Sequence, residues 1–399
     1  MLWGERVRRR RALVGLLVVF ALADAALAFA VVRTDDGQPV RFAQPLHPVA
    51  GDFRPDETQL SECSDDRCFQ QAFGNIAYRE GPKAALALVE DVYGNGSDPA
   101  CHRVTHFIGA ASLARFKGNV TRTLGEGGPT CWSGYYHGVL ERSLVKAKSR
   151  KPGVLASVAR TLCTDTNMTP WVVYGCLHGL GHGLMIATGL NLPISLEVCS
   201  RLGRWWDRDA CRGGVFMENI SSSYGFRSIF LKDDDPVYPC NWVAYETRRR
   251  CYQIVTSRIL QLDGDDWGRT AETCAGVERD FVHMCFQSFG RDVSSRSGRD
   301  PEVIAELCEI ARPYGGEGDC VSAAAYDMTG NFTSGERAGT LCEIVHSGVR
   351  GRCYYGLGTV MGRFRKTPEA RVADCEAIVS DASLVAECIR GGRENLPRT

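Results

Sequence analysis

The sequence predicts an all-α fold: a disulfide-stapled αα-hairpin repeat array, solenoid-like, that follows an N-terminal transmembrane or signal segment. Three observations predict it. Most of the 18 cysteines fall into pairs separated by ten to twelve residues. The first cysteines of these pairs recur about every 34 residues, the length of a helix-turn-helix repeat unit. Finally, 399 residues exceed one ordinary globular domain but suit an array in which each unit contacts only its neighbours.

The N-terminal segment, residues 1–33, has the pattern of an export signal. Four arginines, Arg8 to Arg11, precede an apolar run over 12–32, which places the N-terminus in the cytoplasm. The run is long enough to span a bilayer core of about 30 Å, which favours a retained anchor. Ala28 and Ala30 flank Phe29 as a small-x-small cleavage site, so a cleaved signal peptide stays open. Either interpretation places the rest of the chain outside the cytoplasm, membrane-anchored or secreted.

Composition excludes one class of partner and indicates a compartment. Lys+Arg and Asp+Glu both number 47, so no basic field attracts nucleic acid. An even count of cysteines is typical of an oxidising compartment, whereas zinc ribbons need paired short knuckles that are absent. Glycosylation is expected from an excess of Asn-x-Ser/Thr sequons, although asparagine and threonine also collect at helix ends. The sequons begin at Asn95, Asn119, Asn167, Asn219 and Asn331.

The first elements of the chain are less regular than the rest. Residues 34–60 contain four prolines and little periodicity, which predicts a tether. A Cys-rich α-helical repeat domain then covers 61–393. Its first hairpin is a cap with a short Cys63–Cys68 staple and a second helix over 82–93. Cys101 and Cys131 remain for each other and would join a helix over 100–116 to one over 131–145.

The regular units follow, beginning with the pair Cys163/Cys176. In each, a helical pattern such as 154–162 precedes the first cysteine, and turn-forming residues separate it from the second. A small residue, most often glycine, lies three positions after the second cysteine and predicts a close helix crossing. We expect each staple to contribute about 3 kcal/mol, although bridges between units stay open. The expected pairs are Cys163–Cys176, Cys199–Cys211, Cys240–Cys251, Cys274–Cys285, Cys308–Cys320, Cys342–Cys353 and Cys375–Cys388.

Histidines gather in the units over 100–190, which hold five of the eight in the chain. They form three i,i+4 pairs, each after a cysteine expected to begin a helix, so both side chains of a pair share one helix face. The pairs are His102/His106, His137/Glu141 and His178/His182. We expect a metal site at His106, His137 and His182, because His137 and His182 hold the same register in successive units. His102, His178 and Glu141 would be further ligands or proton carriers, with 191–393 as scaffold units.

Nitrogen and oxygen donors without thiolates favour a divalent transition metal, namely zinc, copper or iron. Two hypotheses follow. In the first, the chain is an extracytoplasmic metal-binding protein, and whether it is a metal-dependent hydrolase or oxidoreductase stays open. In the second, it is an interaction scaffold for a protein or glycan, and the histidines are packing residues. Tyr135 and Tyr136 would be a binding floor beside the site in the first hypothesis and core in the second.

Overall fold

The structure is a computed structural model that describes residues 53–93, 99–128, 130–145, 149–163, 168–222 and 227–396. Within these ranges it is all-helical, with 19 α-helices, short 3₁₀ segments and no strand. The anchor predicted over 12–32 and most of the tether lie outside these ranges. Among the described helices, none combines the length and the apolar character that crossing a membrane requires.

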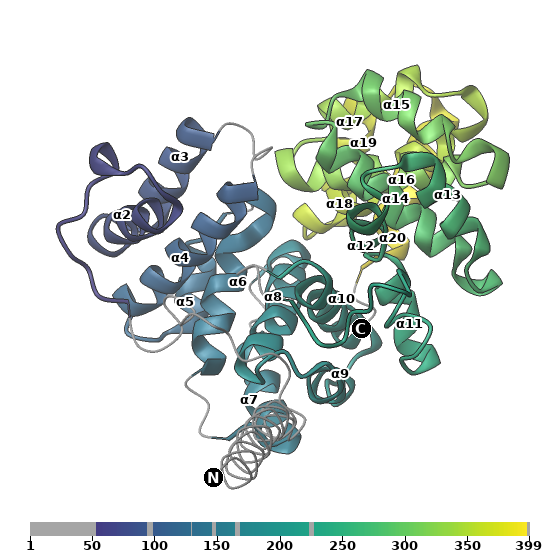
Figure 1. Ribbon diagram of the computed structural model, residues 1–399. Helices are drawn as coiled ribbons and strands as arrows, with labels where there is room; N and C mark the ends of the chain where they lie inside the picture. Colours follow the sequence, from purple (N-terminus) through teal and green to yellow (C-terminus); the bar gives the residue numbers. More distant parts are fainter. Residues whose placement is uncertain are drawn as a thin grey trace, which may run out of the picture.

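The first part of the described chain runs through nine helices, coloured purple to teal in Figure 1. They are α2 (Asp66–Arg79), α3 (Pro82–Tyr93), α4 (Pro99–Arg115), α5 (Val120–Gly125), α6 (Thr130–Val145), α7 (Pro152–Leu162), α8 (Pro170–Ala187), α9 (Leu192–Ser200) and α10 (Trp205–Ile220). The expected helices over 82–93, 100–116, 131–145 and 154–162 are therefore confirmed to within two residues.

The second part is coloured green to yellow. Its helices are α11 (Tyr245–Tyr252), α12 (Thr256–Asp263), α13 (Trp267–Gly276), α14 (Val282–Arg296), α15 (Pro301–Glu309), α16 (Glu317–Phe332), α17 (Glu336–Ile344), α18 (Arg350–Phe364), α19 (Pro368–Ile378) and α20 (Ala382–Glu394).

The nine cysteine pairs are those that the sequence predicts. Their Cα atoms lie 5.1–5.9 Å apart, within the range for disulfides, and no described cysteine is free. Six of the seven regular staples join consecutive α-helices, Cys240–Cys251 ties the turn before α11 to that helix, and the bond Cys101–Cys131 joins α4 to α6 as expected. Nine disulfides indicate an oxidising, extracytoplasmic environment.

One helix start differs from the expectation. Cys176 was expected to begin a helix, but α8 begins six residues earlier, at Pro170. Thr169 caps it by accepting a hydrogen bond from the backbone N–H of Val172, and proline is favoured at the first helical position because its missing N–H needs no partner there. The staple therefore holds α8 near its middle rather than at its end.

The second helices of the hairpins pack against one another in chain order. Contacts run from α2 through α4, α6 and α8 to α10, and again from α14 through α16 and α18 to α20. Glycine permits the close approach that the sequence predicts. A β-carbon on Gly214 would collide with the carbonyl oxygen of His178 on α8, and one on Gly356 with that of Ser322 on α16.

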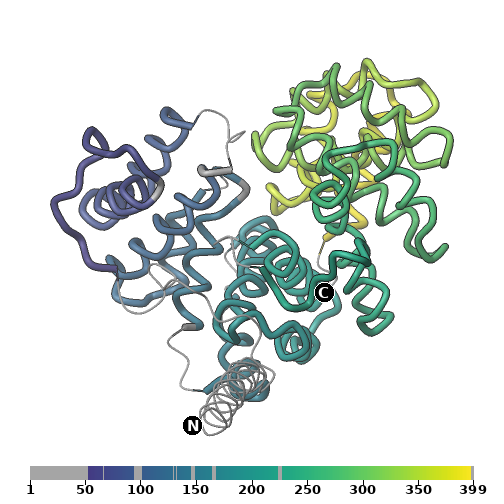
Figure 2. Tube along the Cα trace, in the orientation of Figure 1, coloured from purple at the N-terminus to yellow at the C-terminus, as the bar shows by residue number. Residues whose placement is uncertain are grey.

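The two parts of the chain also touch, which an open array of nearest-neighbour units does not require. Helix α16 contacts α6, and α18 contacts α8. Trp171 on α8 meets Phe364 edge-on, with ring centroids 5.2 Å apart. The indole N–H of Trp206 donates to the carbonyl of Asn395 at 3.3 Å, so the chain end beyond α20 returns to α10, as the trace in Figure 2 shows.

Candidate metal centre

Four neighbouring helices carry the site. His102 and His106 lie on α4, His137 and Glu141 on α6, and His178 and His182 on α8. Because α4, α6, α8 and α10 pack in that order, the faces that carry these side chains meet in one place. The core of the site excludes water almost completely, since His106, His137 and His182 are each at most 2% exposed. The structure thus brings together all six residues expected to hold or assist a metal.

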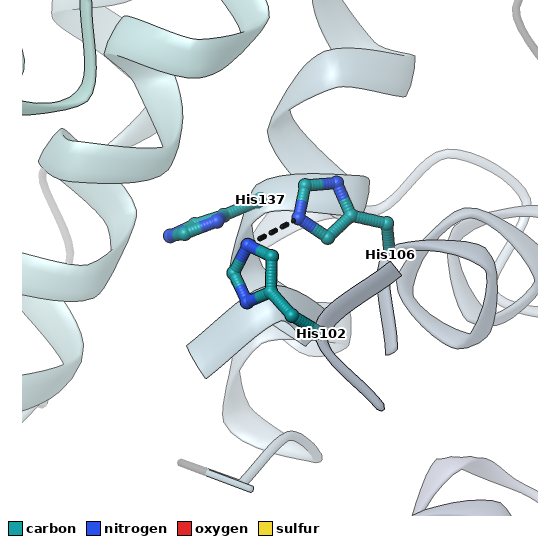
Figure 3. Close-up of side chains that lie close together, drawn as sticks. All are labelled: His102, His106 and His137. Atoms are coloured by element: carbon teal, nitrogen blue, oxygen red, sulfur yellow. Dashed lines mark hydrogen bonds between the residues drawn. The ribbon is translucent and has the colours of Figure 1, made fainter. Parts of the chain in front are cut away.

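The two histidines of α4 point their Nε2 atoms at each other, 3.0 Å apart (Figure 3). The other ring nitrogen of each is already engaged. Nδ1 of His102 lies 2.9 Å from the carbonyl oxygen of Cys131, which can only accept, so this nitrogen carries the proton. Nδ1 of His106 lies 2.9 Å from Oε1 of Glu141 without the geometry of a hydrogen bond, but the negative charge of the carboxylate favours a proton on that nitrogen. In the neutral rings, both Nε2 atoms therefore present lone pairs to the same point.

On α8, His182 also has a carboxylate behind its ring, which α10 supplies. Nδ1 of His182 donates to Oε2 of Glu218 at 2.8 Å, and Oε1 of Glu218 accepts from Ser222 at 3.1 Å. Nε2 of His182 then has a free lone pair and lies 3.3 Å from Nε2 of His178. A carboxylate behind a histidine is the usual second layer of a metal site, because it fixes the tautomer and orients the ring.

His137 lies between the two pairs. Its ring stacks on His182 with centroids 4.2 Å apart and planes 18° apart, and it meets His106 edge-on at 5.2 Å. Figure 3 shows His137 beside the two α4 rings. Its Nδ1 atom is buried and has no hydrogen-bond partner among the described residues. Such an unpaired buried nitrogen is costly unless something outside the chain binds it.

Three sets of side chains bring their ligand atoms within 4.8 Å of one another. The sets are His102, His106 and His137; His137, His178 and His182; and Glu141, His182 and Glu218. The expected triad of His106, His137 and His182 is not itself one of these sets. Its members are instead distributed over them, each beside a partner that the sequence assigned to a supporting role.

Burial keeps the imidazoles neutral. Loss of hydration is the largest cause that lowers the pKa of His102 and of His137, and repulsion from neighbouring histidines adds to it. The same two causes lower the pKa of His178 and bring that of His182 to about 3, although Glu141 raises the latter. Burial therefore contributes more to these shifts than repulsion between the rings does. Neutral imidazole is the form that binds a metal.

Two tyrosines expected near the site are packed into the core. Tyr135 is fully buried and donates from its hydroxyl to the carbonyl oxygen of Thr123 at 2.7 Å. Tyr136 is 2% exposed and lies against α8 at Gly175. Their burial favours the core role over a binding floor.

Glu218 was missed by sequence reasoning. The histidine register lies six residues after the second cysteine, where the unit of Cys211 carries Met217, so that unit was assigned to the scaffold. Glu218 is the next residue, and it is completely buried. A glutamate directly after the apolar residues Val215, Phe216 and Met217 was the available signal, because a buried carboxylate needs a partner.

Comparisons of the chain with protein-family models, with curated proteins and with solved structures find no match, so the function is argued from this chain's own side chains.

Proposed function

We propose that this chain is an extracytoplasmic metal-binding protein whose buried histidine–glutamate cluster holds a transition metal. The observation that carries the proposal is the pair of facing Nε2 atoms of His102 and His106. With the proton of each neutral ring on Nδ1, toward the carbonyl of Cys131 and the carboxylate of Glu141, a hydrogen bond between these Nε2 atoms needs an extra proton, and burial opposes that charge. A metal ion satisfies both lone pairs at once. Two nitrogens bound to a tetrahedral zinc at about 2.0–2.1 Å lie about 3.3 Å apart, close to the distances seen here.

The number of donors supports two ions. Five imidazoles and two carboxylates meet in the cluster, whereas one transition-metal ion takes about four to six ligands. One ion would lie at His102 and His106, and the second at His178 and His182. His137 belongs to both histidine sets, and Glu141 contacts His106 while also belonging to the set of His182. These two side chains would therefore couple the two ions.

The donor set narrows the metal to zinc, copper or iron, since all the cysteines are oxidised and cannot ligate. Bound there, zinc would supply a Lewis acid and an activated water, and copper or iron would supply redox chemistry. The chain itself would hold the rings neutral, fix their tautomers through Glu141 and Glu218, and exclude bulk water. Anchoring to a membrane through residues 12–32 belongs to this proposal, as does glycosylation at exposed sequons such as Asn119.

The test is elemental analysis of protein produced with its disulfides intact. We expect about two equivalents of one metal, and a lower melting temperature after chelation. His137→Ala should lose at least half of the metal. His283→Ala, which changes a histidine of α14 outside the three sets, should lose none. Metal far below one equivalent in untreated protein, with unchanged melting after chelation, would overturn the proposal.

A binding scaffold is the second candidate, and one surface favours it. Trp242 is 54% exposed and stacks on Phe230, with ring centroids 6.2 Å apart, and the tilted ring of Tyr238 lies 5.8 Å away. An exposed aromatic group of this kind suits a sugar ring or an apolar side chain. If the protein carries no metal, binding of oligosaccharides that Trp242→Ala abolishes would favour the scaffold.

A further inference from the structure

A second polar cluster lies beside the histidines, where the two parts of the chain meet. Tyr174 on α8 stacks on His178 with centroids 5.8 Å apart, one helical turn from the metal cluster. From α18, the guanidinium of Arg363 lies 4.4 Å from the centre of the Tyr174 ring. It also donates to the hydroxyl of Tyr326 on α16 at 2.8 Å. Three helices that are distant in sequence thus converge on one point next to His178.

This point carries more positive than negative charge. Arg249 and Arg250 of α11 interact electrostatically with Tyr174, as Arg363 does. Arg250 is paired with Asp209. Among the described residues, no carboxylate lies within ion-pair distance of Arg249 or Arg363, although Asp209 acts on Arg249 from farther away. Two guanidinium groups therefore lack a close counter-charge.

These two groups are not at the open surface. Arg363 is only 4% exposed, and Arg249 is half-buried. The Nε atoms of both are buried without a hydrogen-bond partner among the described residues. Arginines on the outside of the same helices can be satisfied by water, but a buried guanidinium without a counter-ion is unfavourable. An anion of the right shape would relieve this cost.

The positive charge of the arginines also acts on the hydroxyl group of Tyr326. Burial alone would raise the pKa of Tyr326, but Arg363, helped by Tyr174 and Arg250, brings it below its usual value. A tyrosinate at this position could neutralise one arginine, but not both. Hydroxyl groups and planar guanidinium forks together are the donors that recognise carboxylate and phosphate oxygens.

We propose that Arg363, with the hydroxyl groups of Tyr174 and Tyr326 and the longer-range positive charge of Arg249, binds a small oxyanion, a carboxylate or phosphate group, beside the histidine cluster. Binding of the oxyanion itself does not depend on a metal. The further assignment, that this group belongs to the molecule on which the metal acts, rests on the proposed function. The site would hold the charged end of that molecule at the Tyr174 side of His178.

The test is calorimetric titration of metal-free protein with inorganic phosphate and, separately, with acetate and oxalate. Chloride at matched ionic strength is the reference. We expect saturable binding of phosphate or of a carboxylate, and the tighter of the two identifies the group. Arg363→Met should weaken it at least tenfold, because a charged hydrogen bond is lost. Arg352→Met, on the same helix but exposed and paired with Asp319, should leave it within twofold.

If Arg363→Met does not fold, Arg363→Lys serves instead and should bind the oxyanion weakly, because the planar guanidinium that can make two parallel hydrogen bonds is lost. Arg249→Met should weaken binding less than the Arg363 variants do, because Arg249 acts from farther away. Equal heats with chloride and the oxyanions would overturn the proposal, as would equal binding by the Arg363 and Arg352 variants. Tyrosinate absorbance at neutral pH that no oxyanion removes would also overturn it, since Tyr326 would then be the counter-ion. Elemental analysis of each variant keeps the two proposals separate, because a protein without metal can still bind the anion.

Discussion

The helices α4 to α10 and the helices α14 to α20 pack by the same rule but fill their polar interiors differently. In both, glycine lets second helices of hairpins cross closely, as at Gly214 and Gly356. Between α12 and α14, however, the polar groups satisfy one another. Thr256 donates to Asp292 at 2.6 Å, and Ser257 reaches the same carboxylate at 2.8 Å. The histidine cluster instead keeps lone pairs facing each other.

This difference shows that the fold does not need histidines at its helix crossings. The second region places hydroxyls, carboxylates and arginines there, and hydroxyls such as those of Thr256 and Ser294 donate to buried carboxylates. The first region holds neutral rings that crowd one another in a dry space, which costs stability. Residues that cost stability without completing the packing are typical of functional sites.

The largest expected effect comes from breaking a buried ion pair in the region of α14 to α20. Asp327 and Arg299 form a buried ion pair at 3.3 Å, with both side chains at most 4% exposed, and Ser294 donates to the same carboxylate. Asp327→Ala removes the carboxylate beside the buried Arg299 guanidinium and should lower the unfolding free energy by about 4 kcal/mol. Denaturant unfolding measures this.

The metal content of Asp327→Ala should remain at the wild-type value, because Asp327 lies outside the histidine cluster. Asp319→Ala is the control. It breaks a pair with the half-exposed Arg352 and should cost below about 1 kcal/mol. Equal losses for the two variants would contradict the distinction between buried and surface pairs in this region.

The next prediction compares two glycines that each allow a close helix crossing, one beside the histidine cluster and one far from it. Gly214→Ala and Gly356→Ala each force a β-carbon against a backbone carbonyl, so each should cost about 3 kcal/mol. Only Gly214 lies against the helix that carries His178 and His182. Gly214→Ala should therefore lower metal content as well as stability, while Gly356→Ala should lower stability alone. Loss of metal in both variants would mean that the crossing acts on the centre only through global stability.

Acid should destabilise the helices that carry the histidine cluster more than the helices α14 to α20. His182 has its pKa lowered from 6.5 to about 3, mainly by burial. Below about pH 6.5 the unfolded chain therefore binds a proton at His182 that the folded chain does not bind. The unfolding free energy is thus highest above about pH 6.5 and decreases as the pH falls. At pH 5 the loss is about 2 kcal/mol for this group. His102, His137 and His178 act in the same direction.

The measurement is denaturant unfolding of metal-free protein between about pH 7.5 and about pH 5, a range that brackets the ordinary histidine pKa of about 6.5. His182→Gln should flatten the dependence, and His346→Gln, whose ring caps a short 3₁₀ segment at the surface, should not. An unchanged slope in His182→Gln would contradict the assigned origin of the acid sensitivity.

The hairpins and staples could be predicted because cysteine spacing and helical periodicity are local. His102 and His106, four apart, necessarily share a helix face. Local patterns could not show that α18 returns to α8, since that contact depends on how the units curve. For the same reason the sequence did not reveal Arg363 beside Tyr174. Glu218 was missed because it lies one position after the residue of α10 that corresponds to His137 and His182.

Sequons illustrate the same limit. Asn219 matches the acceptor pattern as well as Asn119 does, but it is 1% exposed. Its amide donates to the carbonyl oxygen of Phe230, and its side-chain oxygen accepts from Ser228. The folded chain therefore hides this sequon, whereas Asn119 is exposed. Spacing in the sequence reports neither burial nor partner.

The smallest expected effect concerns the seam between the two regions. Trp206→Phe keeps an aromatic ring on α10 but removes the N–H that donates to Asn395, so it should cost about 1 kcal/mol. Because this bond ties the chain end to the first region, the loss should appear as faster amide hydrogen exchange in α20 with little change in α4 and α6. Metal content should be unchanged. Uniform acceleration of exchange across both regions would show that they unfold as one unit. The two regions would then differ in the chemistry of their polar side chains but not in their stability.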